Sequence, residues 1–71
     1  MRSKLTIEGQ VSSKRTKRVS RGWGTHYYVT IGEKEFFATI KIYDLLSVGS
    51  YVSVSYKKSW ILGEYIIFEV L

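Results

Sequence analysis

Hydrophobic and polar residues alternate along most of the chain with the period of two that is typical of β-strands with one buried face. Leu5, Ile7 and Val11 follow this pattern and predict a strand near residues 4–13. Gly9 falls on the inward set. A glycine there indicates a bulge or a bend, which a first strand needs if it curls around a small closed sheet.

Two further β-rich runs, residues 26–31 and 35–42, are separated by a short polar turn and predict a hairpin with Glu33 and Lys34 at its tip. In this register three pairs point inward: Ile31 with Phe36, Val29 with Ala38, and Tyr27 with Ile40. The opposite face then carries His26, Tyr28, Thr30, Phe37, Thr39 and Lys41. Phe37 is expected diagonally across from Tyr28 on that face.

The segment 43–50 is too short for an ordinary helix but suits one helical turn near 43–47, capped by Asp44 and closed near Gly49. Strands are predicted at 51–57, where apolar and polar residues alternate, and at 64–70. The residues predicted to be buried in the core are Ile7, Val29, Ala38, Ile40, Val52 and Val54.

Five strands with a helical turn between the third and fourth predict an all-β fold, a small five-stranded closed or partly open barrel. The element order is OB-like, and an SH3-like barrel is the alternative. The 71 residues contain no proline, no repeat and no linker composition, so one domain spanning 1–71 is expected.

Composition restricts the chemistry. The chain has no cysteine and one histidine, His26, so neither a disulfide nor a metal site of several His or Cys ligands can stabilise it. With 45% hydrophobic and 15% aromatic residues it can form a core that folds alone. No paired carboxylates or nucleophile with a base are recognisable, so we expect no enzyme and no cofactor. Glu33 and Glu35 are expected to be solvated charges at the hairpin end.

Apolar runs fall far short of the ~20 residues that cross a bilayer, and no signal-peptide pattern is present, so a cytoplasmic protein without a membrane partner is expected.

Charge is distributed unevenly along the chain. Residues 1–24 hold seven basic side chains and one acidic one, and the remaining residues hold four basic and five acidic. A basic loop is expected at about 14–24, since polar residues and glycine accompany its charges. Its five cations are Lys14, Arg15, Lys17, Arg18 and Arg21.

The basic loop and an exposed aromatic face favour binding of nucleic acid, single-stranded DNA or RNA more than duplex, through phosphate contacts and base stacking. The candidate contacts are Lys14, Arg15, Lys17, Arg18, Arg21, Trp23, His26, Tyr28, Phe37 and Lys41. Tyr43 is also expected to point away from the core. The alternative is a protein-interaction module, such as a small viral or accessory regulatory factor, that uses the same face against an acidic protein partner. The domain is expected to be a monomer or a small homo-oligomer.

Three short motifs carry a resemblance: Tyr27-Tyr28-Val29-Thr30, then Glu35-Phe36, then Tyr43-x-x-Leu46-x-Val48-Gly49. Together they resemble small prokaryotic β-domain families of unknown function. Those families typically continue with Gly-Asp, whereas Ser50 follows Gly49 here. The resemblance implies a compact β domain and transfers no activity.

Overall fold

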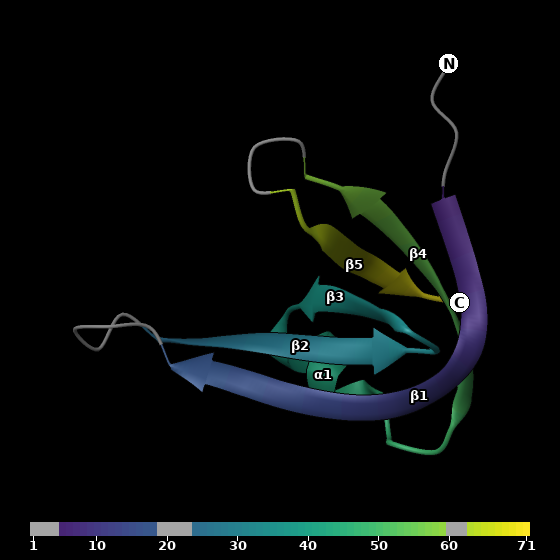
Figure 1. Ribbon diagram of the computed structural model, residues 1–71, viewed down its shortest axis with the longest axis horizontal. Coiled ribbons are helices and arrows are strands. Elements are labelled where there is room, and N and C mark those ends of the chain that lie inside the picture. Colours follow the sequence, from purple (N-terminus) through teal and green to yellow (C-terminus); the bar gives the residue numbers. More distant parts are fainter. Residues whose placement is uncertain (1–4, 19–23, 60–62) are drawn as a thin grey trace.

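The computed structural model describes residues 5–18, 24–59 and 63–71 and forms five strands and one short helix (Figure 1). In chain order the elements are β1 (Leu5–Arg18), β2 (Thr25–Ile31), β3 (Lys34–Ala38), α1 (Ile40–Leu45), β4 (Tyr51–Lys58) and β5 (Tyr65–Val70).

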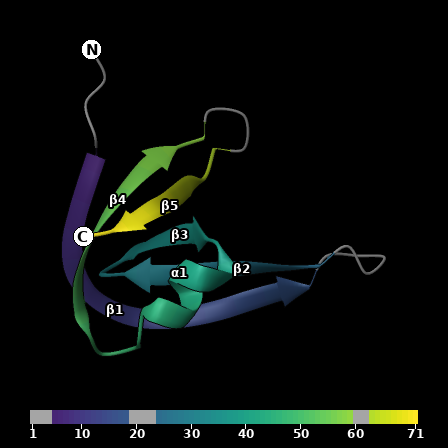
Figure 2. The ribbon, with the colours of Figure 1, turned by 180° about the vertical axis from the view of Figure 1, so that it is seen from behind.

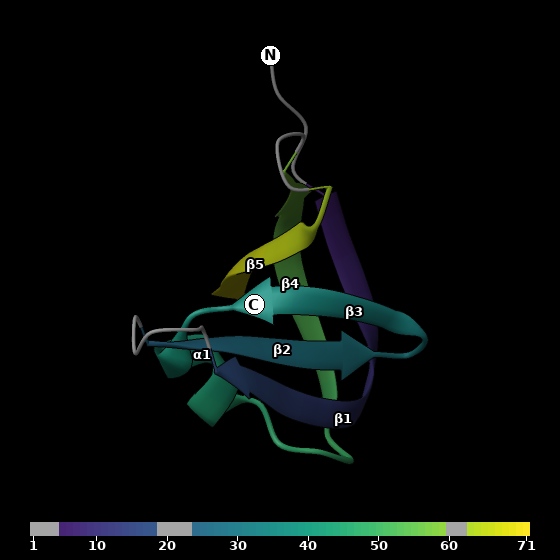
Figure 3. The same ribbon diagram turned by 60° about the vertical axis from the view of Figure 1, so that its left-hand side comes forward.

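The strands close into a barrel in the order β1-β2-β3-β5-β4, with β4 pairing back onto β1. Strands β3 and β5 run parallel, and all other neighbours are antiparallel. Figure 3 shows β1 passing from beside β4 to beside β2. The predicted five-stranded barrel with one short helical element between its third and fourth strands is therefore confirmed.

Strand β1 closes the ring because its two halves have different partners. Residues 5–10 pair with β4, and residues 11–18 pair with β2 across a register shift between Val11 and Ser13. Gly9 lies just before this change, where a Cβ atom would stand 3.0 Å from Cγ2 of Ile31. The missing side chain thus lets the strand pass close to the hairpin end, and the bulge follows at Ser12, whose hydroxyl donates to the Gly32 carbonyl at 3.0 Å.

The prediction of a loop beginning at residue 14 was wrong for residues 14–18. These residues continue β1 and pair in register with β2, from Lys14 opposite Val29 to Arg18 opposite Thr25. A strand tolerates a run of charges when the partner strand supplies the aromatic and β-branched side chains. Residues 19–23 lie outside the described part of the chain.

The β2-β3 hairpin turns at Gly32 and Glu33, because Ile31 pairs with Lys34. Gly32 has φ of 64°, the left-handed conformation that such a two-residue turn demands. The register differs by two residues from the predicted one, so the paired residues of β2 and β3 keep the faces expected for them. Tyr28 and Phe37 are directly opposite each other rather than diagonal.

Strand β3 ends four residues earlier than predicted, and α1 begins at Ile40. The Thr39 hydroxyl caps this helix by accepting a hydrogen bond from the Ile42 amide at 3.4 Å. The β-branched residues had suggested a longer strand, and Asp44 lies inside the helix rather than at its cap. Ile40 is consequently 52% exposed, so its assignment to the core was wrong.

The core fills the barrel around Phe36, whose ring lies 5.1 Å from that of Tyr56 and 5.9 Å from that of Tyr65. Its buried members are Val11, Val29, Ile31, Phe36, Ala38, Leu46, Val54 and Ile67. The burial predicted for Val29, Ala38 and Val54 is confirmed, whereas Ile7 and Val52 are partly buried against this cluster.

We expect Phe36→Ala to lower the free energy of unfolding by about 3–5 kcal/mol, because it empties the centre of the barrel. Ile40→Ala should change it by less than about 0.5 kcal/mol, because Ile40 is largely solvated. Urea unfolding of both variants beside the parent measures the difference. Equal losses would show that α1 packs more tightly than described.

Candidate functional site

Side chains of β1, β2 and β3 that point away from the core form one continuous surface, which we call the outer face. Strand pairing aligns Arg15 with Tyr28 and Tyr28 with Phe37, and it places Lys17 opposite His26. The outer face therefore consists of Arg15, Lys17, His26, Tyr28, Glu35 and Phe37. Cations on β1 thus adjoin aromatic rings on β2 and β3.

Three rings on the outer face pack edge to face. The centroid of Phe37 lies 5.1 Å from that of His26 and 5.6 Å from that of Tyr28. Tyr28 is only 7% exposed, so its prediction as an exposed stacking residue was wrong: neighbouring side chains cover it. Phe37 is half-buried and His26 is exposed. The surface available to a ligand is hence provided by His26 and Phe37, with Tyr28 beneath them.

Arg15 lies at the edge of this aromatic group and is held from two sides. Its guanidinium carbon is 4.4 Å from the Tyr28 ring centroid. Its Nε and Nη2 atoms donate to the two oxygens of Glu35 at 2.5 and 2.9 Å. These hydrogen bonds are the main cause that lowers the pKa of Glu35 and raises the pKa of Arg15. Arg15 is fixed in place, and its charge is partly balanced.

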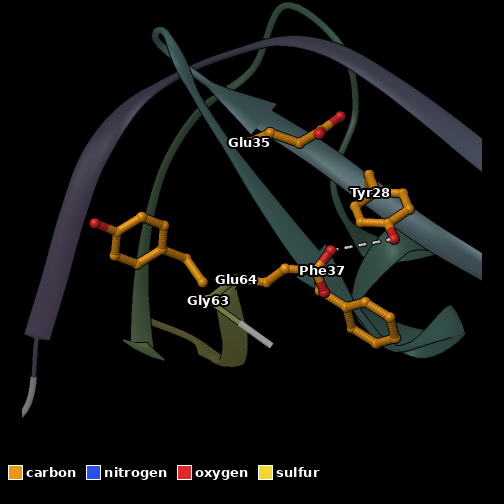
Figure 4. Close-up of a pocket in the computed structure, with 6 residues that line it drawn as sticks. Tyr28, Glu35, Phe37, Gly63 and Glu64 are labelled. Carbon is orange, nitrogen blue, oxygen red and sulfur yellow. Dashed lines mark hydrogen bonds between the residues drawn. The ribbon is translucent and has the colours of Figure 1, made fainter. Parts of the chain in front are cut away.

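An open pocket of about 160 Å³ adjoins the outer face where β3 meets β5 (Figure 4). Its lining residues are Tyr28, Glu35, Phe37, Gly63, Glu64 and Tyr65. The Tyr28 hydroxyl reaches across β3 and donates to Oε2 of Glu64 at 3.5 Å. Burial, followed by the Glu64 charge, raises the pKa of Tyr28, so the phenol stays protonated at neutral pH.

Lys14 points to the opposite side of β1 and has a structural role there. Its ammonium donates to the Leu46 carbonyl at 2.7 Å and lies 4.1 Å from the Tyr43 ring centroid. Tyr43 in turn packs 5.0 Å from Tyr27. The expectation that Tyr43 points outward was therefore wrong, because α1 turns it back against β2.

The other predicted contacts are dispersed. Arg18 alternates onto the same side of β1 as Lys14. Lys41 lies on α1 instead of a strand. In Figure 1 α1 lies behind β2, and in Figure 2, which is turned by 180°, it lies in front of β2. Arg21 and Trp23 lie outside the described residues.

Two carboxylates of the site were missed. Glu35 had been assigned to solvent, yet it pairs with Arg15 across β2. A correct hairpin register would have placed it diagonal to Tyr28, within reach of a long side chain from β1. Glu64 gave no local signal, since only the parallel pairing of β5 with β3 brings it near Tyr28.

Within residues 5–18, 24–59 and 63–71, no three His, Cys, Asp or Glu side chains are grouped as a metal site would require. The described part of the chain also holds no helix of the length and apolar character needed to span a membrane.

No protein-family model, curated protein or solved structure matches this chain.

Replacing Lys14 with methionine should lower stability by about 1 kcal/mol, because the carbonyl of buried Leu46 loses its donor while the aliphatic stem remains. Thermal unfolding should show a midpoint lower by roughly 4–8 °C. Lys17→Met is the matched control and should leave the midpoint nearly unchanged, since Lys17 is exposed. A similar drop in both variants would contradict a specific role for Lys14.

Acidification should weaken the fold through Glu35. Its pKa is lowered in the folded state, so its stabilising contribution is present above the unfolded pKa and is lost as pH falls through the folded pKa. The effect should be small because both partners are exposed to solvent. The thermal unfolding midpoint is measured from neutral pH to about pH 2. It should fall less steeply for Glu35→Gln than for Glu33→Gln, which removes an equal charge at the hairpin tip. Parallel curves would exclude the pair as a source of acid sensitivity.

Proposed function

We propose that this domain binds single-stranded nucleic acid on the outer face. The observation that carries the proposal is the alignment of cations with accessible rings on three adjacent strands. Arg15 and Lys17 follow one another on β1, and His26 and Phe37 lie 5.1 Å apart beside them. Basic groups contact the phosphate backbone, and aromatic side chains stack on unpaired bases, which is the usual combination in single-strand binding.

The topology supports this proposal. A closed order β1-β2-β3-β5-β4, parallel β3 and β5, and a helix between β3 and β4 favour an OB-fold over the SH3-like alternative. OB-folds bind oligonucleotides on the face of their second and third strands. The outer face occupies those strands in this chain. The likeness in strand order supports the proposal by analogy, beside the residues themselves.

Each outer-face residue has a distinct part in the proposed binding. Lys17 supplies an exposed charge to a phosphate, and Arg15 presents its remaining guanidinium N–H donors beside the rings. His26 and Phe37 provide surfaces for a base. Tyr28 supports Phe37 from beneath and keeps its hydroxyl directed toward Glu64. Duplex DNA gains only the phosphate contacts, because its bases are already stacked.

A second candidate function rests on the edge of β1. In the pairings of the described residues, Ser13 to Arg18 bond to β2 alone, so one edge of this half-strand has no strand beside it. An extended peptide could add to such an edge by main-chain hydrogen bonds. The basic side chains along it would select an acidic peptide.

Two variants separate the parts of the proposed binding. Lys17→Gln should weaken binding to a labelled single-stranded oligonucleotide and reduce the log-log salt slope by about 0.7. His26→Ala should cost about 1–3 kcal/mol if the ring stacks on a base, with little change in slope. Lys41→Gln is the control for Lys17, since it removes the same charge from α1 on the other side of the hairpin. Fluorescence anisotropy at several salt concentrations measures all three.

Equal effects of Lys17→Gln and Lys41→Gln would indicate general electrostatic attraction in place of a defined face. Binding of an acidic peptide in the same assay, with no binding of oligonucleotides at low salt, would favour the strand-addition function.

A further inference from the structure

The pocket between β3 and β5 offers more than a stacking surface, because it combines aromatic walls with directed polar groups. Its rings come from Tyr28 and Phe37, because the ring of Tyr65 packs against Phe36 and Tyr56 instead. Its volume of about 160 Å³ is below the ~300–1,000 Å³ of sites for drug-sized ligands. That size suits one flat ring system, with the rest of the ligand outside.

One of the two carboxylates that line the pocket is already paired with a cation. Two carboxylates, Glu35 and Glu64, line it, and Glu35 is already bound to Arg15 through both oxygens. Arg15 therefore neutralises Glu35, and the Glu64 carboxylate is the one that a ligand can use. A flat ring that carries hydrogen-bond donors can bind this carboxylate and pack against the aromatic walls at the same time.

The polar groups directed into the pocket form an asymmetric pattern. Glu64 is an acceptor through both carboxylate oxygens, and the Tyr28 hydroxyl beside it is a donor. Their present contact is long at 3.5 Å, so a ligand that offers better partners to both groups would replace a weak hydrogen bond. The pocket thus requires two adjacent donors and a neighbouring acceptor.

Among the nucleobases, guanine alone presents that pattern on one edge. Its N1–H and N2–H₂ groups are adjacent donors, and O6 is the acceptor next to them. Adenine and cytosine each place a ring acceptor beside the amino group, which would face a carboxylate oxygen. Uracil and thymine have a single donor between two carbonyls. In each of these four bases, at least one acceptor would therefore face a carboxylate oxygen, which repels it.

We propose that this pocket binds an unpaired guanine, with Glu64 accepting from N1–H and N2–H₂, the Tyr28 hydroxyl donating to O6, and Phe37 forming a wall. The inference rests on the proposed single-strand binding, to which it adds base preference.

The test compares ten-nucleotide thymidine oligomers that carry one central guanine, inosine, adenine or thymine. A bidentate carboxylate contact should favour guanine over adenine and thymine by roughly 5- to 100-fold in affinity. Inosine, which keeps N1–H and O6 but lacks the N2 amino group, should be intermediate. Equal affinity for all four oligomers would overturn the guanine proposal and leave single-strand binding in place.

Glu64→Gln should abolish the preference, because an amide supplies only one acceptor, while affinity for the all-thymidine oligomer stays the same or rises. Tyr28→Phe should reduce the preference while retaining the ring. Glu33→Gln is the matched control, since it removes one negative charge from the hairpin tip, and it should keep the full preference. Retention of the preference in Glu64→Gln would overturn the assigned role of Glu64.

Titration with guanosine and adenosine monophosphates separates this proposal from the proposed function. Guanosine monophosphate, but not the adenosine compound, should shift the amide resonances of Gly63 and Phe37. A selective shift without any oligomer binding would support the pocket and overturn the single-strand function. Absence of both responses would overturn both proposals.

Discussion

Closure of the sheet through β1 is the constraint on which the rest of the structure depends. A five-stranded sheet becomes a barrel only if the first and last strands of its order pair with each other, and β1 allows this by pairing with β4 along its first half and with β2 along its second. The change of partner takes place over a few residues. Gly9 permits the close approach to Ile31, and the bulge before Ser13 turns the strand. A Cβ atom at position 9 would lie 3.0 Å from Cγ2 of Ile31, so one of the two groups would have to shift.

The same strand determines where the candidate site lies. Past the bulge, β1 extends along β2 as far as Arg18, so basic side chains that the sequence places in one run are divided between two sides. Arg15 and Lys17 reach the outer face, whereas Lys14 turns inward to Leu46 and holds the end of α1 against the hairpin. Closure and charge placement are thus consequences of one register.

Much of the fold could be predicted from the sequence because alternation of apolar residues marks strands directly. The inward-facing residues of β2 and β3 were predicted correctly despite a register error of two residues, because a shift by an even number leaves each residue on the same face of the sheet. Local patterning failed where tertiary partners decide: β2 draws Lys14 to Arg18 into a strand, and the Thr39 cap makes Ile40 helical. Of the residues proposed as contacts, Arg15, Lys17, His26, Tyr28 and Phe37 share one face in the structure.

The cations and rings of the candidate site are visible in the sequence, but their accessibility is not. Nothing local shows that Tyr28 is covered, because the covering groups come from β1, β3 and the segment before β5. Glu64 comes close to the site because β5 pairs in parallel with β3. Long-range pairings of that kind have no short-range signature for sequence analysis to detect.

The parallel pairing of β3 with β5, here called the seam, also has a consequence for motion. Among the described residues, β3 and β5 are paired at two positions, Phe36 with Tyr65 and Phe37 with Ile66, whereas β1 and β2 are paired at seven. Local opening requires the least free energy where the fewest main-chain hydrogen bonds and packed neighbours must separate. Amide exchange with solvent should therefore be faster at this seam than along the β1-β2 ladder. A ligand bound across β3 and β5 would slow that exchange and stabilise the closed barrel at its shortest strand pairing.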